Sequence, residues 1–168
     1  MRYAAFLRGV SPMNCKMPAL ASALLAAGFT DVKTHLSSGN AVFTAPSAKL
    51  PALEQRVEAA LAAALGRPFP THIRPIPALA SLLDSDPFAR YPLPRNAKRI
   101  VTFLRAPSTA ALPPRKDGAQ ILAVVGTEVL SMYTPSPKGP VFMTVLERTF
   151  GKDITTRTWE TVSRVASR

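Results

Sequence analysis

The chain has 168 residues, a formal net charge of +11 from 21 Lys and Arg against 10 Asp and Glu, and a single Cys. With 47% hydrophobic and 18% charged residues, its composition excludes a largely disordered chain. No run of about 18 apolar residues is present and the apolar stretch at the N-terminus is too short for a signal peptide, so we expect a cytoplasmic protein without a membrane span.

The first half of the chain predicts two helices interleaved with four short strands. Pro18 and Pro51 suit the first turn of a helix, and Gly28 and Gly66 suit helix ends. The predicted elements are strand 3–7, helix 18–28, strand 32–36, strand 41–44, helix 51–66 and strand 71–74. This β-α-β-β-α-β order is typical of a ferredoxin-like fold, which we assign to a subdomain at 1–86.

The predicted topology brings two distant segments together. In the split arrangement the first two strands run parallel, so the loop after the first and the turn after the second emerge at the same end of the sheet. We therefore expect the loop from Arg8 to Lys16 to lie beside the turn from Ser37 to Asn40.

The second half predicts a smaller α+β subdomain. A helix around 78–83 leads to a proline-rich link at 87–97, and the subdomain covers 98–168. Its strands are expected at 100–105, 120–125 and 128–133, the last two joined by Gly126-Thr127 as a type II′ turn. A helix containing Phe142 to Thr149 and a short helix from Trp159 complete the chain.

Several segments together resemble a known family. They are Leu7-Arg8-Gly9-Val10, Lys16-Met17-Pro18, Gly28 to Val32, Leu36 to Phe43, Pro137 to Pro140, and Thr155 to Trp159. In this order they resemble the family of domain of unknown function 1697, over nearly the whole chain. The resemblance implies a compact bacterial α+β protein with a ferredoxin-like N-terminal subdomain, and it implies no established catalytic residues.

Candidate ligand-binding residues lie where the loop from Arg8 to Lys16 and the turn from Ser37 to Asn40 are expected to meet, which we call the rim of the first subdomain. The guanidinium of Arg8 suits a carboxylate or phosphate, and Lys16 adds a second cation. Further donors are the polar side chains Asn14, Ser37, Ser38 and Asn40. The structural alternative is that Arg8 clamps loop carbonyls and that the Ser-Gly-Asn turn serves the backbone alone.

A second set of candidates lies near the C-terminus. Lys138 precedes a predicted helix start, where free N–H groups attract anions. Thr156 and Arg157 offer a hydroxyl next to a cation, and Trp159 could stack on a base. The alternatives are a solvated basic turn at Lys138, and a core-anchoring Trp159 in a helix capped by a threonine.

The sequence gives no sign of a metal site, a cofactor or a catalytic nucleophile. Cys15 has no basic partner nearby in sequence, and His35 and His72 lie outside any ligand-spaced motif. The acids Asp31, Glu54, Glu58 and Asp84 are interpreted as surface or capping residues.

The positive charge predicts anionic partners without naming one. Three functions stay open: binding of an anionic small molecule or nucleotide at the N-terminal rim, binding of nucleic acid, and an enzyme that acts on a phosphorylated substrate by electrostatic positioning. RNA-recognition modules of this topology expose aromatic rings on the sheet, here represented only by Phe6 and Phe43. The pattern indicates no particular oligomeric state.

Overall fold

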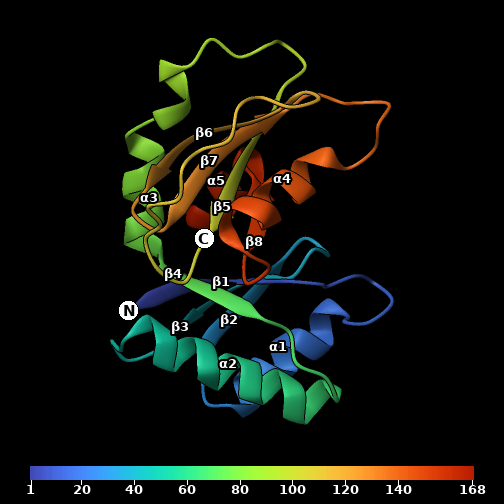
Figure 1. The fold of residues 1–168 in the computed structure, drawn as a ribbon. Helices are drawn as coiled ribbons and strands as arrows, with labels where there is room; N and C mark the ends of the chain where they lie inside the picture. The colour runs from blue at the N-terminus through green and yellow to red at the C-terminus, as the bar shows by residue number, and fades with distance from the viewer. The chain divides into compact units, whose positions relative to one another are not determined.

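A computed structural model describes all residues, 1–168, and they form two compact units (Figure 1). The first unit contains Met1–Asp84 and Ser163–Arg168, and the second contains Ser85–Val162. Each unit holds one four-stranded antiparallel sheet with helices, so the chain is an α+β protein.

The elements of the first unit follow the predicted order. They are β1 (Arg2–Leu7), α1 (Met17–Ala26), β2 (Thr30–His35), β3 (Asn40–Thr44), α2 (Leu50–Leu65), β4 (Thr71–Pro75) and α3 (Ile76–Asp84). The sheet order is β2-β3-β1-β4, and every neighbouring pair is antiparallel. α1 and α2 cover one face of this sheet (Figure 1).

Prolines and glycines set the helix boundaries as expected. Pro18 and Pro51 occupy the first turns of α1 and α2, where a missing N–H costs nothing. Gly28 and Gly66 follow the helices with φ of 89° and 73°, a left-handed conformation that glycine adopts readily. In α1 the buried side chains are Leu20, Ala23 and Leu24, whereas Leu25 is 54% exposed.

Two carboxylates of α2 have a structural role that the sequence did not suggest. β4 is an edge strand, and unpaired N–H groups on an edge invite pairing with other chains. Glu54 accepts a hydrogen bond from the N–H of Ile73 at 3.0 Å, and Glu58 accepts one from the N–H of Thr71 at 2.9 Å. The interpretation of Glu54 as a surface or capping residue was therefore wrong: its carboxylate is buried and accepts a hydrogen bond from the edge strand.

The second unit contains a short helix, four strands and two helices. They are η1 (Pro87–Arg90), β5 (Lys98–Phe103), β6 (Ala119–Val125), β7 (Glu128–Tyr133), α4 (Val141–Phe150), β8 (Thr155–Thr158) and α5 (Trp159–Ala166), the last of which ends in the first unit. The sheet order is β6-β7-β5-β8.

One turn of the second unit was predicted correctly and one strand was missed. Gly126 has φ of 62° while Thr127 does not have a positive φ, as the predicted type II′ turn requires. The segment Thr155–Thr158 was not expected to be a strand, yet it pairs antiparallel with β5. Only four residues long and entirely polar, it has no apolar alternation that would have indicated a strand.

The structure contains no helix with the length and hydrophobicity needed to cross a membrane.

Candidate functional site

The predicted rim of the first unit forms as expected. The backbone N–H of Leu7 donates to the carbonyl of Gly39 at 2.9 Å, so the end of β1 and the turn between β2 and β3 lie side by side. An added Cβ on Gly39 would lie 2.8 Å from Cγ2 of Val10, which shows how closely the turn approaches the β1–α1 loop. The predicted juxtaposition of these two segments is confirmed.

Two of the six predicted rim residues hold the backbone in place. Asn14 accepts a hydrogen bond from the N–H of Ser11 at 2.9 Å and donates to the carbonyl of Gly9 at 2.8 Å. Asn40 is fully buried and donates to the carbonyl of His35 at 2.8 Å. Their amide groups therefore shape the loop and the turn.

The other four rim residues are accessible. Arg8 is half-buried, and its backbone N–H donates to the carbonyl of Pro70 at 2.8 Å, which fixes the start of the loop. Lys16, Ser37 and Ser38 are exposed, with the hydroxyl of Ser38 accepting a hydrogen bond from Asn40 at 3.0 Å. These side chains give the rim two cations and two hydroxyl groups.

The turn at the rim contains backbone strain. Leu36 has φ of 58°, a conformation that costs a branched side chain of order 1–3 kcal/mol and that clusters at functional sites. Its side chain is 44% exposed, and Met13 in the facing loop is 94% exposed. Burial of Leu36 therefore does not compensate for the strain.

Lys138 lies beside an apolar cavity in the second unit. Its ammonium group is 3.1 Å from a carboxylate oxygen of Asp117, one of the residues lining a cavity of about 440 Å³. The rings of Tyr133 and Phe142 also line this cavity and stack with centroids 4.6 Å apart. The charge of Lys138 is thus already balanced by a neighbouring acid.

Thr156 and Arg157 lie in β8. The Thr156 hydroxyl is 3.9 Å from the sulfur of Met143, and the Arg157 guanidinium donates to the carbonyl of Thr156 at 2.7 Å and to the hydroxyl of Thr155 at 3.0 Å. Burial lowers the pKa of Arg157 to about 10, so this guanidinium is still charged at neutral pH. These contacts fix Arg157 to its own strand.

Trp159 has the core-anchoring role given as its alternative. It is 7% exposed, and its ring meets that of Phe88 edge-on with centroids 5.1 Å apart. Thr158 caps α5 by accepting a hydrogen bond from the N–H of Thr161 at 3.2 Å. No open face of the indole is left for a base to stack on.

Cys15 is buried in the core of the first unit, and burial raises the pKa of its thiol. A raised pKa disfavours the thiolate, which is the nucleophilic form. No group of three or more His, Cys, Asp or Glu side chains is placed to hold a metal ion.

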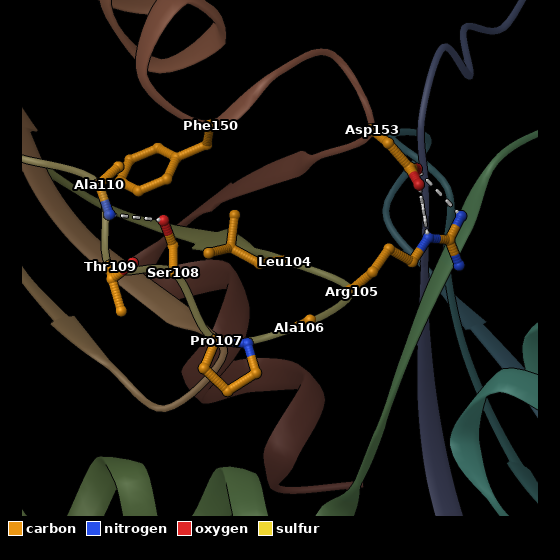
Figure 2. Close-up of a pocket in the computed structure, with 9 residues that line it drawn as sticks. All are labelled: Leu104, Arg105, Ala106, Pro107, Ser108, Thr109, Ala110, Phe150 and Asp153. Atoms are coloured by element: carbon orange, nitrogen blue, oxygen red, sulfur yellow. Dashed lines mark hydrogen bonds and ion pairs between the residues drawn. The ribbon is translucent and has the colours of Figure 1, made fainter.

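A shallow pocket of about 460 Å³ lies at the end of β5 (Figure 2). Figure 2 shows its two charged lining residues, Arg105 and Asp153, turned toward each other, with N–O distances of 3.0 to 3.2 Å between the guanidinium and the carboxylate. Ser108 accepts a hydrogen bond from the N–H of Ala110 at 3.2 Å. The lining groups thus bind one another, and the pocket presents no convergent set of ligand donors.

The fold defines an α+β protein built on two four-stranded antiparallel sheets. The chain belongs to the family described as protein of unknown function (DUF1697), whose model matches residues 1–129. This match is shorter than the nearly complete coverage expected, because it leaves out the segments around Lys138 and Arg157.

The whole chain is similar in fold to a solved structure, described as the conserved bacterial protein SP0830 from Streptococcus pneumoniae. The TM-score is 0.71 at 18% sequence identity, and the alignment covers 99% of this chain and 97% of the other. No curated protein matches the sequence significantly.

Proposed function

We propose that the protein binds an anionic small molecule or nucleotide at the rim of the first unit, through Arg8, Lys16, Ser37 and Ser38. The observation that carries this proposal is the hydrogen bond from Leu7 to Gly39, because it brings the two segments that bear these side chains together. The strained Leu36 in the same turn adds support, since such strain accumulates at ligand sites.

The chemistry of the rim suits an anion. A guanidinium offers a fork of donors that matches carboxylate or phosphate oxygens, and an ammonium adds a mobile point charge. No Asp or Glu occurs in residues 8–16 or 36–40, so the two segments themselves carry a positive charge. Asn14 and Asn40 keep the loop and the turn in shape and need not touch the ligand.

We also propose that residues 1–86 are a ferredoxin-like subdomain, joined by the link 87–97 to a C-terminal α+β subdomain at 98–168. The element order β1-α1-β2-β3-α2-β4 and the sheet order β2-β3-β1-β4 support this assignment.

Nucleic-acid binding through strand aromatics is less well supported. Phe6 and Phe43 are both fully buried, so neither ring presents a face to a base. An enzyme acting by electrostatic positioning remains the other alternative, and it would use the same cations.

The experiment compares an Arg8→Ala/Lys16→Ala variant with a control of equal charge, Lys49→Ala/Lys152→Ala, whose two lysines are exposed elsewhere. Thermal unfolding is followed with nucleotides, sugar phosphates and short oligonucleotides. A ligand at 100 times its Kd stabilises the folded protein by about 2.7 kcal/mol.

We expect one anionic compound to stabilise the wild type and the control but not the rim variant, and Lys16→Ala alone to weaken the effect. The proposal fails if no compound stabilises the wild type, or if every compound that stabilises the wild type stabilises the rim variant equally. An affinity confined to oligonucleotides that falls linearly with log salt would favour nucleic acid instead, and turnover of a phosphoester lost in the rim variant would favour an enzyme.

A further inference from the structure

A second cation-rich feature of the first unit lies on β2 and β3, next to the turn that belongs to the rim. It is a cavity of about 340 Å³ lined by Lys33, Thr34, His35, Val42 and Arg168. No Asp or Glu side chain lines the cavity, and it shares no residue with the proposed rim site. We call it the His35 cavity.

The strand register explains how its lining comes together. Lys33 pairs with Val42 across β2 and β3, and His35 lies two residues further along β2, on the same face as Lys33. The neighbours of Val42 in β3, Ala41 and Phe43, point into the core that α1 and α2 cover, so Val42 points to the opposite face.

The imidazole of His35 has an unexplained polar atom. Its Nε2 is buried and has no hydrogen-bond partner. Buried polar atoms in folded proteins nearly always have a partner, so a lone one calls for a missing ligand or water. At this position the surrounding charges indicate which ligand would fit.

No Asp or Glu side chain pairs with the cations around His35. The side chains of Lys33, Arg164 and Arg168 form no ion pair with Asp or Glu, and the guanidinium of Arg2 donates to the main-chain oxygen of Arg168, the last residue of the chain, at 2.9 Å. Arg2 also donates to the carbonyl of Asp31, the only acid in β2. Arg2 therefore fixes the end of the chain near β2 while the Arg168 guanidinium stays available.

These charges also act on His35 itself. Burial, followed by the positive charges of Arg168 and Arg164, lowers the pKa of His35, so the imidazole is neutral at pH 7. A neutral imidazole can carry its proton on Nε2 and donate it to an oxygen acceptor. An anion in the cavity would offset the effect of the arginines and raise this pKa.

We infer that the His35 cavity binds the phosphoryl group of a small phosphorylated molecule. Nε2–H of His35 donates to a phosphoryl oxygen, and Lys33 and Arg168 balance the negative charge. The cavity falls within the range of small-ligand sites and exceeds the space of one phosphate, which leaves room for a compact polar group. No Phe, Tyr or Trp lines it, so nothing stacks on a nucleobase, and a sugar phosphate fits better than a nucleotide.

The test uses the fact that the chain has only two histidines. The ring C–H signals of His35 and His72 are followed by proton NMR while inorganic phosphate is added at constant ionic strength, and His35→Gln assigns the signals. We expect the His35 signal to shift and saturate and its pKa to rise, whereas the fully buried His72 serves as the internal reference. The inference is overturned if His35 does not respond or if both signals move together without saturation.

Variants show which side chains bind phosphate and separate binding at the His35 cavity from binding at the rim. We expect Lys33→Ala/Arg168→Ala to weaken phosphate binding at least tenfold, while the control Lys49→Ala/Lys152→Ala leaves it unchanged. The Arg8→Ala/Lys16→Ala variant should also leave the His35 response intact, so either site can fail without the other. A response lost in the rim variant but kept in Lys33→Ala/Arg168→Ala overturns the inference.

The ligand class is tested with glucose 6-phosphate and AMP in the same titration. We expect the sugar phosphate to bind more tightly than inorganic phosphate, and AMP to bind no more tightly than the sugar phosphate. An AMP affinity well above that of the sugar phosphate would overturn the assigned class.

Discussion

Replacement of Glu54 by Ala tests how the first unit protects the edge of its sheet. The carboxylate accepts the hydrogen bond from Ile73 at 3.0 Å and lies 3.9 Å from the guanidinium of Arg74, which is also buried. Loss of the acceptor leaves a buried N–H unsatisfied, at a cost of about 1–3 kcal/mol. Removal of one partner from a buried ion pair costs roughly 3–5 kcal/mol.

These two costs overlap, and Arg74 keeps its hydrogen bond to the carbonyl of Ile73 at 2.8 Å. We therefore expect Glu54→Ala to lower the free energy of unfolding by about 3 kcal/mol, the low end of the range for a broken buried pair. At about 2–4 °C per kcal/mol for a chain of this size, Tm should fall by roughly 6–12 °C.

The assay is urea unfolding followed by circular dichroism. Glu54→Gln keeps an acceptor for Ile73 and should lose less stability than Glu54→Ala. Gln55→Ala, a neighbouring exposed position on α2, should stay within about 0.5 kcal/mol of the wild type. A Glu54→Ala variant as stable as Gln55→Ala would refute the role assigned to the carboxylate.

Four other positions give sharp expectations. Trp159→Ala empties a buried site and should cost about 3–5 kcal/mol in urea unfolding. Gly118→Ala should lower Tm, because its φ is 84° and the added Cβ would lie 2.5 Å from the hydroxyl of Thr134. Cys15 should react slowly with a chromogenic disulfide reagent until the protein is unfolded, since burial raises the pKa of its thiol. The unfolding free energy should fall as the pH drops below about 6.5, because the pKa of His35 is lower in the folded than in the unfolded chain and the unfolded chain therefore binds the proton more tightly. His35→Gln should remove this part of the pH dependence.

The elements that the sequence predicted are those set by local chemistry. A proline in the first turn and a glycine with positive φ after the last turn mark α1 and α2, and the Gly-Thr pair marks the turn between β6 and β7. The approach of the β1–α1 loop to the β2–β3 turn was also predictable, because it follows from the order of the elements alone.

The features that the sequence did not predict depend on partners far along the chain. β8 is a strand because β5 supplies its hydrogen-bonding partner, and its four polar residues carry no pattern of their own. Glu54 lies on a helix among residues typical of a solvated face, and only the position of β4 at the edge of the sheet makes burial of its carboxylate favourable.

The candidate residues could be recognised from the local sequence, whereas the residues of the His35 cavity come together only in the fold. Asn14 and Asn40 stood out because polar residues gather in turns, and the structure uses their amides to hold those turns. No local pattern joins Lys33, His35 and Arg168, since Lys33 and His35 lie on a predicted strand and Arg168 lies at the far end of the sequence. A net charge of +11 predicts an anionic partner, and the fold gathers Lys33 and Arg168 beside the buried Nε2 of His35 with no Asp or Glu side chain in the lining.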